Sequence, residues 1–547
     1  MNRGSAIPAD RSASSAGSAG RSPWAWVPTL YFFEGIPYFL VNVVSVTMFK
    51  RLGMDNASLA ALTSLLYLPW VIKPLWSPLV DVVRSKRWWI LVMQAALVVC
   101  FAALAFSLPG LGARAAGAAG AGVAEGVAAG AAGAGVAEAV AAGAAASGAA
   151  GAAASGTAPP VGAFIPALVL FYVGAMLSAT HDIAADGFYM IALGKHDQSL
   201  FVGIRSTFYR ISSVFGQGVI VVVAGLLETR LGVIPRAWSL TLLGSSVLLG
   251  LLALWHQWAV PQVESEGCGR KKRQKCDTPP AKTMGGASNS GDFDTAPAAT
   301  VEAAPGVPAA AAPAEAAAAP AAPAAPRSFG QAFATFFAKP GIGLALAFML
   351  LFRLPEAFSV KMLTPFLLDP TSAGGLGLST TQSGLVYGTV GVIALTIGGI
   401  LGGIFAAKVG LRKAMWPMAL SLALPCAVYL YMAIAQPAQL WVVYLCVAFD
   451  QFGYGFGFTA YMLYLMYFSE GEYKTSHYAI CTAFMALSMM VPGFFAGWLQ
   501  QSLGYTGFFV LVMACCAATV AVTAILAPRI EDAAPKTAPK IKEGNKC

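Results

Sequence analysis

Long apolar runs separated by short polar segments dominate the chain, and their length suits helices that cross a bilayer. A hydrocarbon core of about 30 Å needs about 20 consecutive apolar residues in a helix. Such runs predict twelve membrane-spanning helices over residues 24–49, 58–80, 88–108, 163–190, 201–227, 238–259, 341–368, 382–407, 415–435, 441–468, 478–501 and 508–528. We expect the first run to remain in the protein as a helix, because no small-residue cleavage site ends it.

Two segments interrupt this pattern and divide the chain. Residues 260–340 are polar at first and then rich in Ala and Pro, which is typical of a disordered linker. Residues 110–160 are almost wholly Ala and Gly, and we expect them to form a non-spanning outer loop. The predicted organisation is a cytoplasmic tail, a six-helix half containing that loop, a cytoplasmic disordered linker, a second six-helix half and a final cytoplasmic tail, over residues 1–23, 24–259, 260–340, 341–528 and 529–547.

Composition and charge agree with a membrane protein and set its orientation. Of the residues, 57% are hydrophobic and 11% charged, whereas soluble proteins carry about 25% charged residues. With the amino terminus in the cytoplasm, 24 of the 34 Lys and Arg residues fall in cytoplasmic segments, 5 in outer loops and 5 inside spans. This bias predicts that both termini are cytoplasmic. It also accounts for the net charge of +9 without a nucleic-acid partner.

Several charged residues lie inside the predicted spans. A charge at mid-bilayer costs about 2.5 to 3.5 kcal/mol on insertion scales, so each one needs a partner, water or a function. We predict that a substrate and proton pathway is formed by Glu34, Lys73, Asp182, Asp186, Arg205, Arg210, Arg353, Glu356 and Asp450. Lys361 is a further charge in the seventh span, nearer its outer side.

In the first half, Asp182 and Asp186 are four residues apart, so they share one face of a helix. They suit a proton-responsive pair beside an anion-binding arginine, or an ion-pair network that latches a gate, and we expect Arg210 to approach them. Glu34 precedes Gly35 and Pro37, a pattern that loosens a helix and exposes backbone carbonyls to a cavity. A buried pair of Glu34 with Lys73 or an arginine is the alternative.

In the second half, Arg353 suits recognition of a carboxylate or phosphate, with a local pair to Glu356 as the alternative. Asp450 is followed by Gly453, Gly455 and Gly457, which either allow close helix packing or expose backbone to substrate. The four histidines are scattered, and no nucleophile or metal-ligand constellation is present. We therefore expect neither an enzyme nor a metal or cofactor site.

Two short basic turns occupy matching places in the two halves. The first contains Asp81, Arg84 and Arg87 after span two, and the second contains Lys408 and Arg412 after span eight. Each resembles the loop signature of the major facilitator superfamily in a degenerate form. That resemblance implies two halves that rock about a central cavity lined by spans one, four, seven and ten, with these turns as cytoplasmic gating loops.

A closer resemblance is to the peptide/acetyl-coenzyme A transporter family, which includes the AmpG muropeptide permeases. It rests on the run from Ala179 to Gly187 and on further stretches at Gly35–Pro37, Leu68–Asp81, Tyr209–Arg210, Phe352–Ala357 and Ala496–Trp498. The resemblance implies proton-coupled import of muropeptides across a bacterial inner membrane, with a small-molecule substrate, protons and the lipid bilayer as partners and a monomer as the working unit. A carrier of acyl-coenzyme A, sugars, peptides or drugs, or a non-transporting sensor, is the alternative.

Overall fold

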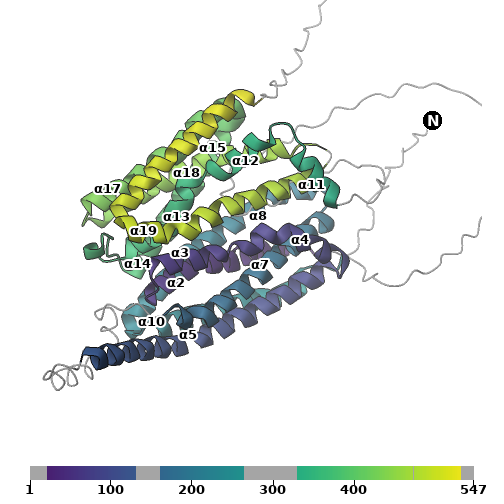
Figure 1. The fold of residues 1–547 in the computed structure, drawn as a ribbon. Helices are drawn as coiled ribbons and strands as arrows, with labels where there is room; N and C mark the ends of the chain where they lie inside the picture. The colour runs from purple at the N-terminus through teal and green to yellow at the C-terminus, as the bar shows by residue number, and fades with distance from the viewer. Residues whose placement is uncertain (1–20, 131–159, 264–328, 472, 531–547) are drawn as a thin grey trace, which may run out of the picture.

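The structure, a computed structural model, describes residues 21–130, 160–263, 329–471 and 473–530. These residues form helices and no strands, arranged as two groups that lie side by side (Figure 1). The first group comes from the amino-terminal part of the chain and the second from the carboxyl-terminal part. The predicted all-helical membrane fold with two halves is therefore confirmed.

The first half contains six crossing segments, several of which are interrupted. Span one comprises α1 (Val27–Phe39), a wide π-helical turn η2 (Leu40–Val44) and α2 (Ser45–Arg51), and span two comprises α3 (Asn56–Leu65) and α4 (Leu68–Val82). The remaining four are α5 (Lys86–Gly130), α7 (Ile165–Ala192), the run α8 (Lys195–Val214), η5 (Phe215–Ile220) and α9 (Val221–Leu231), and α10 (Ile234–Ala259). Local sequence sets several of these boundaries. Asp55 caps α3 through the Ser58 amide, and Gly232 ends α9 at a φ of 65°.

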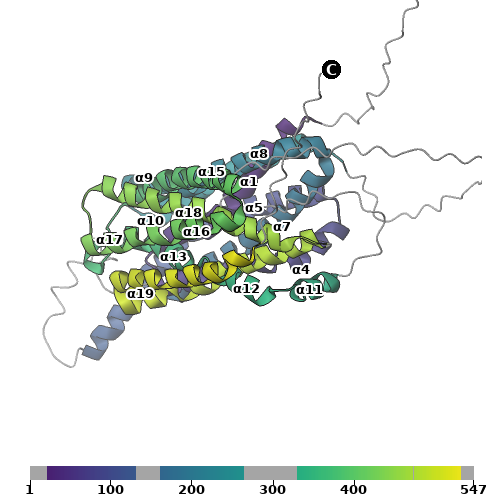
Figure 2. The same ribbon diagram turned by 90° about the horizontal axis from the view of Figure 1, so that it is seen from above.

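The second half repeats this plan. Span seven comprises α12 (Ile342–Leu351) and α13 (Leu354–Leu368), span eight α14 (Thr380–Ser383), η7 (Gly384–Gly391) and α15 (Val392–Val409), and span nine α16 (Leu411–Ala423), η8 (Leu424–Cys426) and α17 (Ala427–Ala435). Span ten is α18 (Leu440–Ser469), and α19 (Lys474–Leu526) contains the last two. Figure 2, seen from above, shows these helices overlying those of the first half, with α19 along one edge of the view.

Ten of these helices are long and apolar enough to cross a membrane by length and composition. One of the ten, Ser476–Arg529, contains two predicted spans, because its backbone turns at Gly504, where φ is 67° and ψ is 174°. α18 matches the predicted tenth span and has 30 residues, but Asp450, Gln451 and its glycines and tyrosines make it more polar than the ten. All twelve predicted spans are therefore present as helices.

Two segments differ from the sequence predictions. α5 continues to Gly130, so the first part of the Ala/Gly-rich segment is helical where a loop was expected. Alanine has the highest helix propensity, and no proline or polar cluster stops the helix between residues 111 and 130. The expected disordered linker ends earlier than predicted, because α11 (Phe329–Phe337) is helical and buries Phe336 completely. Residues 131–159 and 264–328 of these two segments lie outside the described residues, as do residues 1–20 and 531–547 of the two tails.

Close backbone contact joins the two halves at mid-height. The wide turn η5 of the first half packs against the wide turn η7 of the second. A Cβ atom built on Gly388 would lie 2.0 Å from the carbonyl oxygen of Gln217, so only a glycine fits there. α19 packs along α3 and α4, and α14 packs on α9. The halves therefore meet through helices that belong to spans two, five, eight and eleven.

Candidate functional site

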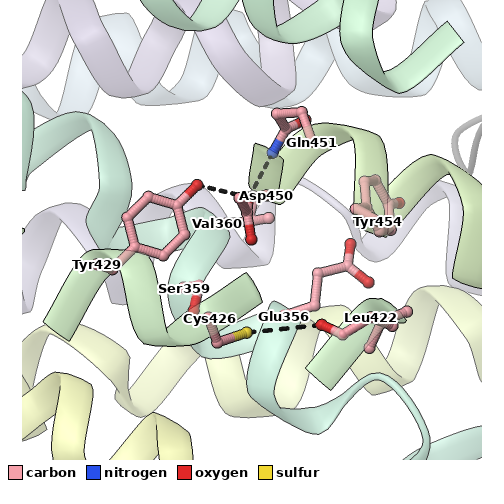
Figure 3. A pocket seen from close by; sticks show the side chains of 9 residues that line it. All are labelled: Glu356, Ser359, Val360, Leu422, Cys426, Tyr429, Asp450, Gln451 and Tyr454. Atoms are coloured by element: carbon pink, nitrogen blue, oxygen red, sulfur yellow. Dashed lines mark hydrogen bonds between the residues drawn. The ribbon is translucent and has the colours of Figure 1, made fainter. Parts of the chain in front are cut away.

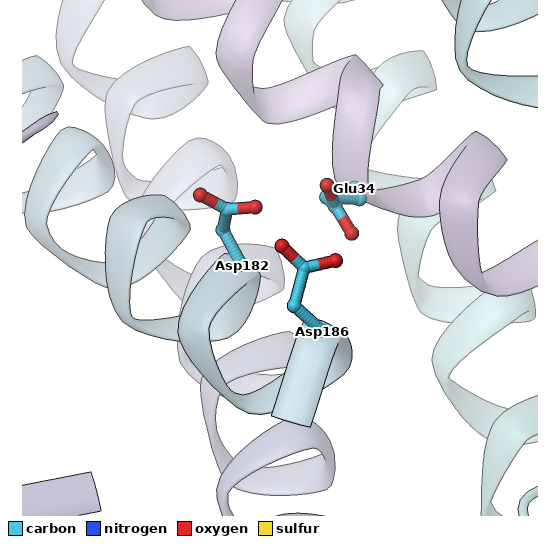
Figure 4. A group of neighbouring side chains, drawn as sticks. All are labelled: Glu34, Asp182 and Asp186. Atoms are coloured by element: carbon cyan, nitrogen blue, oxygen red, sulfur yellow. The ribbon is translucent and has the colours of Figure 1, made fainter. Parts of the chain in front are cut away.

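Three carboxylates from two helices converge in the interior of the first half. Glu34 lies on α1, and Asp182 and Asp186 lie one turn apart on α7, with one oxygen of each within 4.8 Å of the others (Figure 4). Gly35 allows α1 to approach α8 at this level, because a Cβ there would lie 1.8 Å from Ser212 Oγ. The helix continues through Pro37, and its wide turn begins only at Leu40. The loosening predicted at Gly35 and Pro37 is therefore displaced toward the carboxyl-terminal part of the span.

Two cations compensate two of these carboxylates. Lys73 of α4 forms an ion pair with Asp182 Oδ2. Arg205 of α8 approaches Asp186, with Nη1 3.4 Å from Oδ1, and donates a hydrogen bond of 3.0 Å to Tyr31 Oη. The Tyr31 hydroxyl in turn donates to Asp186 Oδ1 at 3.2 Å. The prediction that Arg210 approaches the aspartates is wrong: Arg205 lies one and a half turns nearer the start of α8 and takes that place.

Two charged groups in this region have buried polar atoms without a hydrogen-bond partner among the described residues. Glu34 is 4% exposed, and its Oε2 atom is buried without a hydrogen bond. The Nε and Nη2 atoms of Arg210 are also buried without hydrogen-bond partners. With all groups ionised, three carboxylates face only Lys73 and Arg205, which leaves one negative charge to be neutralised. The three carboxylates are the group best placed to hold a metal ion, but the two adjacent cations oppose a divalent ion there.

A second charged group lies at the break between α12 and α13. Arg353 Nε and Nη2 bind the two oxygens of Glu356 at 2.8 and 2.7 Å, and both residues are buried. Arg353 also donates to Tyr454 Oη at 3.0 Å and stacks over the ring of Phe458. Arg353 therefore forms the local ion pair that was the alternative interpretation. Two of its guanidinium nitrogens are already hydrogen-bonded to Glu356. Pro355 in the first turn of α13 fits the break, since it lacks an amide hydrogen.

Asp450 occupies a separate polar position on α18. Tyr429 Oη and Gln451 Nε2 donate to its Oδ2 atom at 2.5 and 3.0 Å. The glycines that follow serve helix packing: a Cβ on Gly455 would lie 2.1 Å from the Leu395 carbonyl oxygen, and one on Gly457 2.4 Å from that of Met418. Of the two interpretations of this glycine series, close packing is the one that the structure supports.

The basic turns predicted as gating loops have different surroundings. Arg87 donates to the carbonyl oxygens of Val260 and Gln257 at 3.0 and 2.8 Å and so fixes the end of α10. Arg84 is exposed beside the ring of Trp88. Lys408 and Arg412 are exposed around Gly410, whose φ of 82° makes the turn between α15 and α16. The side chain of Asp81 lies outside the described part of the structure. None of these contacts tests a gating role, which stays a prediction.

Polar contacts between the halves, which the sequence did not reveal, gather at the end predicted to face outward. Lys50 Nζ lies 2.5 Å from Asp369 Oδ1, and Asn56 and Tyr505 donate to Asp369 Oδ2 at 3.2 and 2.6 Å. Nearby, Gln501 donates to Asp55 at 3.1 Å. Burial of Asp55 raises its pKa, but hydrogen bonds from Ser58 and Gln501 outweigh this and hold the pKa below its ordinary value.

A second group of contacts joins the halves at the same end. Glu228 of α9 accepts a hydrogen bond of 2.6 Å from Thr380 of α14 and pairs with Arg51 at 3.0 Å. Trp238 donates to the other oxygen of Glu228 at 2.7 Å. In the sequence these residues are only polar groups at span ends. Lys50, Arg51 and Glu228 could be located there by their charge, but nothing in the chain indicates their partners.

Known proteins with similar sequences are membrane transporters. The model of the Major Facilitator Superfamily matches residues 349–546. The anhydromuropeptide permease of Escherichia coli K12 is 25% identical over 179 residues, which are 33% of this chain and 35% of that protein. The putative transporter AmpG 2 of Rickettsia felis is 27% identical over 34% of this chain and 44% of its own length. The chain thus spans between a third and a half of the length of these relatives.

Solved structures agree over much more of the chain. A bacterial homolog of the human lysosomal transporter Spinster, in an inward-facing and unoccupied conformation, aligns with a TM-score of 0.56 at 12% identity, covering 92% of this chain and 96% of that one. The nucleoside transporter NupG gives a TM-score of 0.56 at 13% identity, with 92% and 99% covered. These neighbours are transporters and not enzymes. The chain has the major facilitator fold, and residues 349–546 resemble the Major Facilitator Superfamily.

Proposed function

We propose that this protein is a secondary active transporter that imports muropeptides together with protons by alternating access. Its likeness to an anhydromuropeptide permease supports the substrate class, and its two six-helix halves support the transport cycle. We further propose that it works as a monomer in a bacterial inner membrane with both termini in the cytoplasm.

The observation that carries the proposal is the excess of one carboxylate in the first-half interior. Glu34, Asp182 and Asp186 lie within 4.8 Å of one another, while only Lys73 and Arg205 pair with them. Carboxylates at this separation cannot all remain ionised at low cost, so the group takes up a proton. Glu34 is the natural place for that proton, because its Oε2 has no hydrogen-bond partner in the described structure. A proton that enters and leaves this group couples the pH gradient to the position of the two halves.

Two cations without a carboxylate partner among the described residues support the proposed substrate class. Arg210 has two buried nitrogens without partners. Lys361 is 3% exposed, and among the described residues its ammonium group contacts the Thr63 hydroxyl at 3.3 Å and the face of the Tyr67 ring, with no carboxylate in ion-pair distance. The carboxylates of a muropeptide would satisfy these two cations. The Tyr67 ring beside Lys361 offers a surface on which a sugar ring can stack.

The direct test is uptake of labelled anhydromuropeptide into proteoliposomes that contain the purified protein, with and without an imposed pH gradient. We expect accumulation above the external concentration with a gradient, and its collapse when a protonophore is added. If correctly folded protein accumulates no muropeptide under either condition, the substrate assignment fails. If it accumulates muropeptide equally with and without the gradient, the substrate assignment stands and the proton coupling fails.

A further inference from the structure

A small polar pocket lies in the second half, apart from the Glu34, Asp182 and Asp186 carboxylates of the first half. It is enclosed by α13 on one side, by the start of α17 with the turn before it on another, and by α18 (Figure 3). Its polar lining comes from Glu356, Ser359, Tyr429, Asp450, Gln451 and Tyr454. Glu356 belongs to span seven and Tyr454 to span ten. The pocket therefore extends from the facing sides of these two helices toward span nine.

Asp450 brings an uncompensated negative charge to this pocket. It is 8% exposed, and its hydrogen bonds come from the neutral groups of Tyr429 and Gln451, both to Oδ2. Within the described ranges, no Lys or Arg lies within ion-pair distance of it. The interior carboxylates Asp182, Asp186 and Glu356 each have such a partner. A buried carboxylate in a membrane requires a counter-charge or a proton, so Asp450 differs from these three in needing one from outside the described chain.

Ser359 supplies a second, independent sign that the pocket receives a ligand. Its side chain lines the pocket and is 5% exposed, yet its hydroxyl has no hydrogen-bond partner in the described structure. A buried hydroxyl left without a partner is unfavourable, and a bound ligand would supply the missing hydrogen bond. The oxygens of Glu356 lie on the same pocket, although Arg353 already balances their charge.

We infer that this pocket binds one small monovalent cation, either a sodium ion or the primary ammonium group of a bound solute, through Asp450 and Ser359. Oxygen atoms dominate the polar lining, which suits a hard cation or an ammonium donor and excludes an anion. One uncompensated carboxylate matches one positive charge. A divalent ion such as calcium is held by six to eight oxygens, commonly with several carboxylates, which this pocket does not supply. The pocket is separate from the three carboxylates proposed to carry the proton.

Thermal unfolding of the purified full-length protein tests this inference without any transport measurement. The protein is titrated with sodium chloride or with methylammonium chloride, at constant ionic strength, against choline chloride. A ligand that binds only the folded state raises Tm in a saturable way, and we expect a rise of roughly 2 °C or more for at least one of the two cations. Sodium alone would identify a resident ion, and methylammonium alone the ammonium group of a solute.

Matched variants separate the pocket from general salt effects. Asp450→Asn should abolish the rise, with Glu470→Gln, an exposed carboxylate, as its control. Ser359→Ala should shift the titration to at least severalfold higher concentration and keeps the test decisive if Asp450→Asn does not fold. Ser502→Ala, an exposed hydroxyl on α19, is its control. If neither cation raises Tm, or if the rise persists unchanged in both pocket variants, the inference is wrong, whatever the uptake experiment shows.

Discussion

The ion pair between Lys50 and Asp369 ties the end of the first crossing to the end of the seventh, with 2.5 Å between Nζ and Oδ1. It is the shortest of several polar contacts that hold the halves together at the predicted outer end. Each side chain is 14% exposed, so the pair is screened less than a surface ion pair. In an alternating-access cycle, these contacts must break for that end to open.

Asp369→Asn should therefore open the predicted outer end more often. The change removes the charge that holds Lys50 and weakens the hydrogen bond from Tyr505. A cysteine introduced at Ser64, which is buried two turns along α3 from Asn56, should react roughly tenfold faster with an external, membrane-impermeant thiol reagent. Labelling is measured by mass spectrometry of the α3 peptide.

Two controls belong to this prediction. Glu470→Gln breaks a more exposed pair with Lys474, 3.9 Å apart in a different turn, and should leave the labelling rate unchanged. Exchanging the charges with Lys50→Asp and Asp369→Lys should restore slow labelling. Equal labelling of the Asp369→Asn variant and the parent protein would contradict a latch at this position.

Glu34→Gln should uncouple transport from the proton without unfolding the protein. Among the described residues Lys73 and Arg205 pair with Asp182 and Asp186, so neutralising Glu34 leaves no cation without its carboxylate. We expect exchange of substrate across the membrane to continue while pH-driven accumulation is lost. Counterflow and gradient-driven uptake measured on the same proteoliposomes distinguish the two activities. Accumulation at the parent level would remove Glu34 from the proton pathway.

Asp182→Asn should behave differently, because it leaves the partly buried Lys73 ammonium group without its carboxylate. Removing one partner leaves a partly desolvated charge uncompensated, so the variant should unfold at a lower temperature. Adding Lys73→Met should recover much of the lost stability without recovering proton-driven uptake. A Tm equal to that of the parent protein would show that the ion pair does not stabilise this interior.

Substitutions of Arg205 and Arg210 should have different effects: the first should lower stability, and the second should weaken substrate binding. Arg205→Gln removes contacts to Asp186 and Tyr31 and should lower Tm. Arg210→Gln removes no described hydrogen bond of Nε or Nη2, so Tm should stay the same. If Arg210 binds a substrate carboxylate, the substrate KM should rise about tenfold or more, because a charge-assisted hydrogen bond contributes about 1.5–3 kcal/mol. An unchanged KM would exclude Arg210 as a substrate contact.

Gly455→Ala should destabilise the packing of α18 on α15. The new methyl group would lie 2.1 Å from the carbonyl oxygen of Leu395, and overpacking of this kind costs about 1–3 kcal/mol. Gly343→Ala is the matched control, because nothing lies within 4 Å of a Cβ at that helical position. Thermal unfolding of the two variants checks the difference. Equal Tm values would mean that the helices can separate there without cost.

The sequence was sufficient for the fold because each crossing is encoded locally. A run of about 20 apolar residues identifies a span by itself, and basic residues between runs predict its direction. Even α18 was found in this way, although Asp450 and the glycines make it the most ambiguous span. The same local reasoning failed where no side chain marks a boundary, as in α5, whose helix runs on into the Ala/Gly-rich segment.

The candidate site was predictable only in part, because pairing between helices depends on their rotation and depth. Charged residues inside spans could be named at once, and Glu34, Asp182 and Asp186 do converge. The choice between Arg205 and Arg210 could not be made, since these residues are five positions apart on one helix and differ by about 140° in direction. Asp369 was missed because an aspartate at a span end is ordinary until its partners on α2 and α19 are seen.

The approach of Gly388 to Gln217 has a mechanical consequence for the whole molecule. At that level two wide helical turns approach closely through the backbones of Gln217, Gly218 and Gly388, so little side-chain bulk there resists a small rotation of one half against the other. The contact lies between the two ends of the bundle and can act as a fulcrum, so that separation at one end brings the other end together. Because residue 388 has no side chain, the two halves can be in close contact there and still rotate against each other. A bulkier residue would hold them apart and prevent this rotation while each half stayed folded.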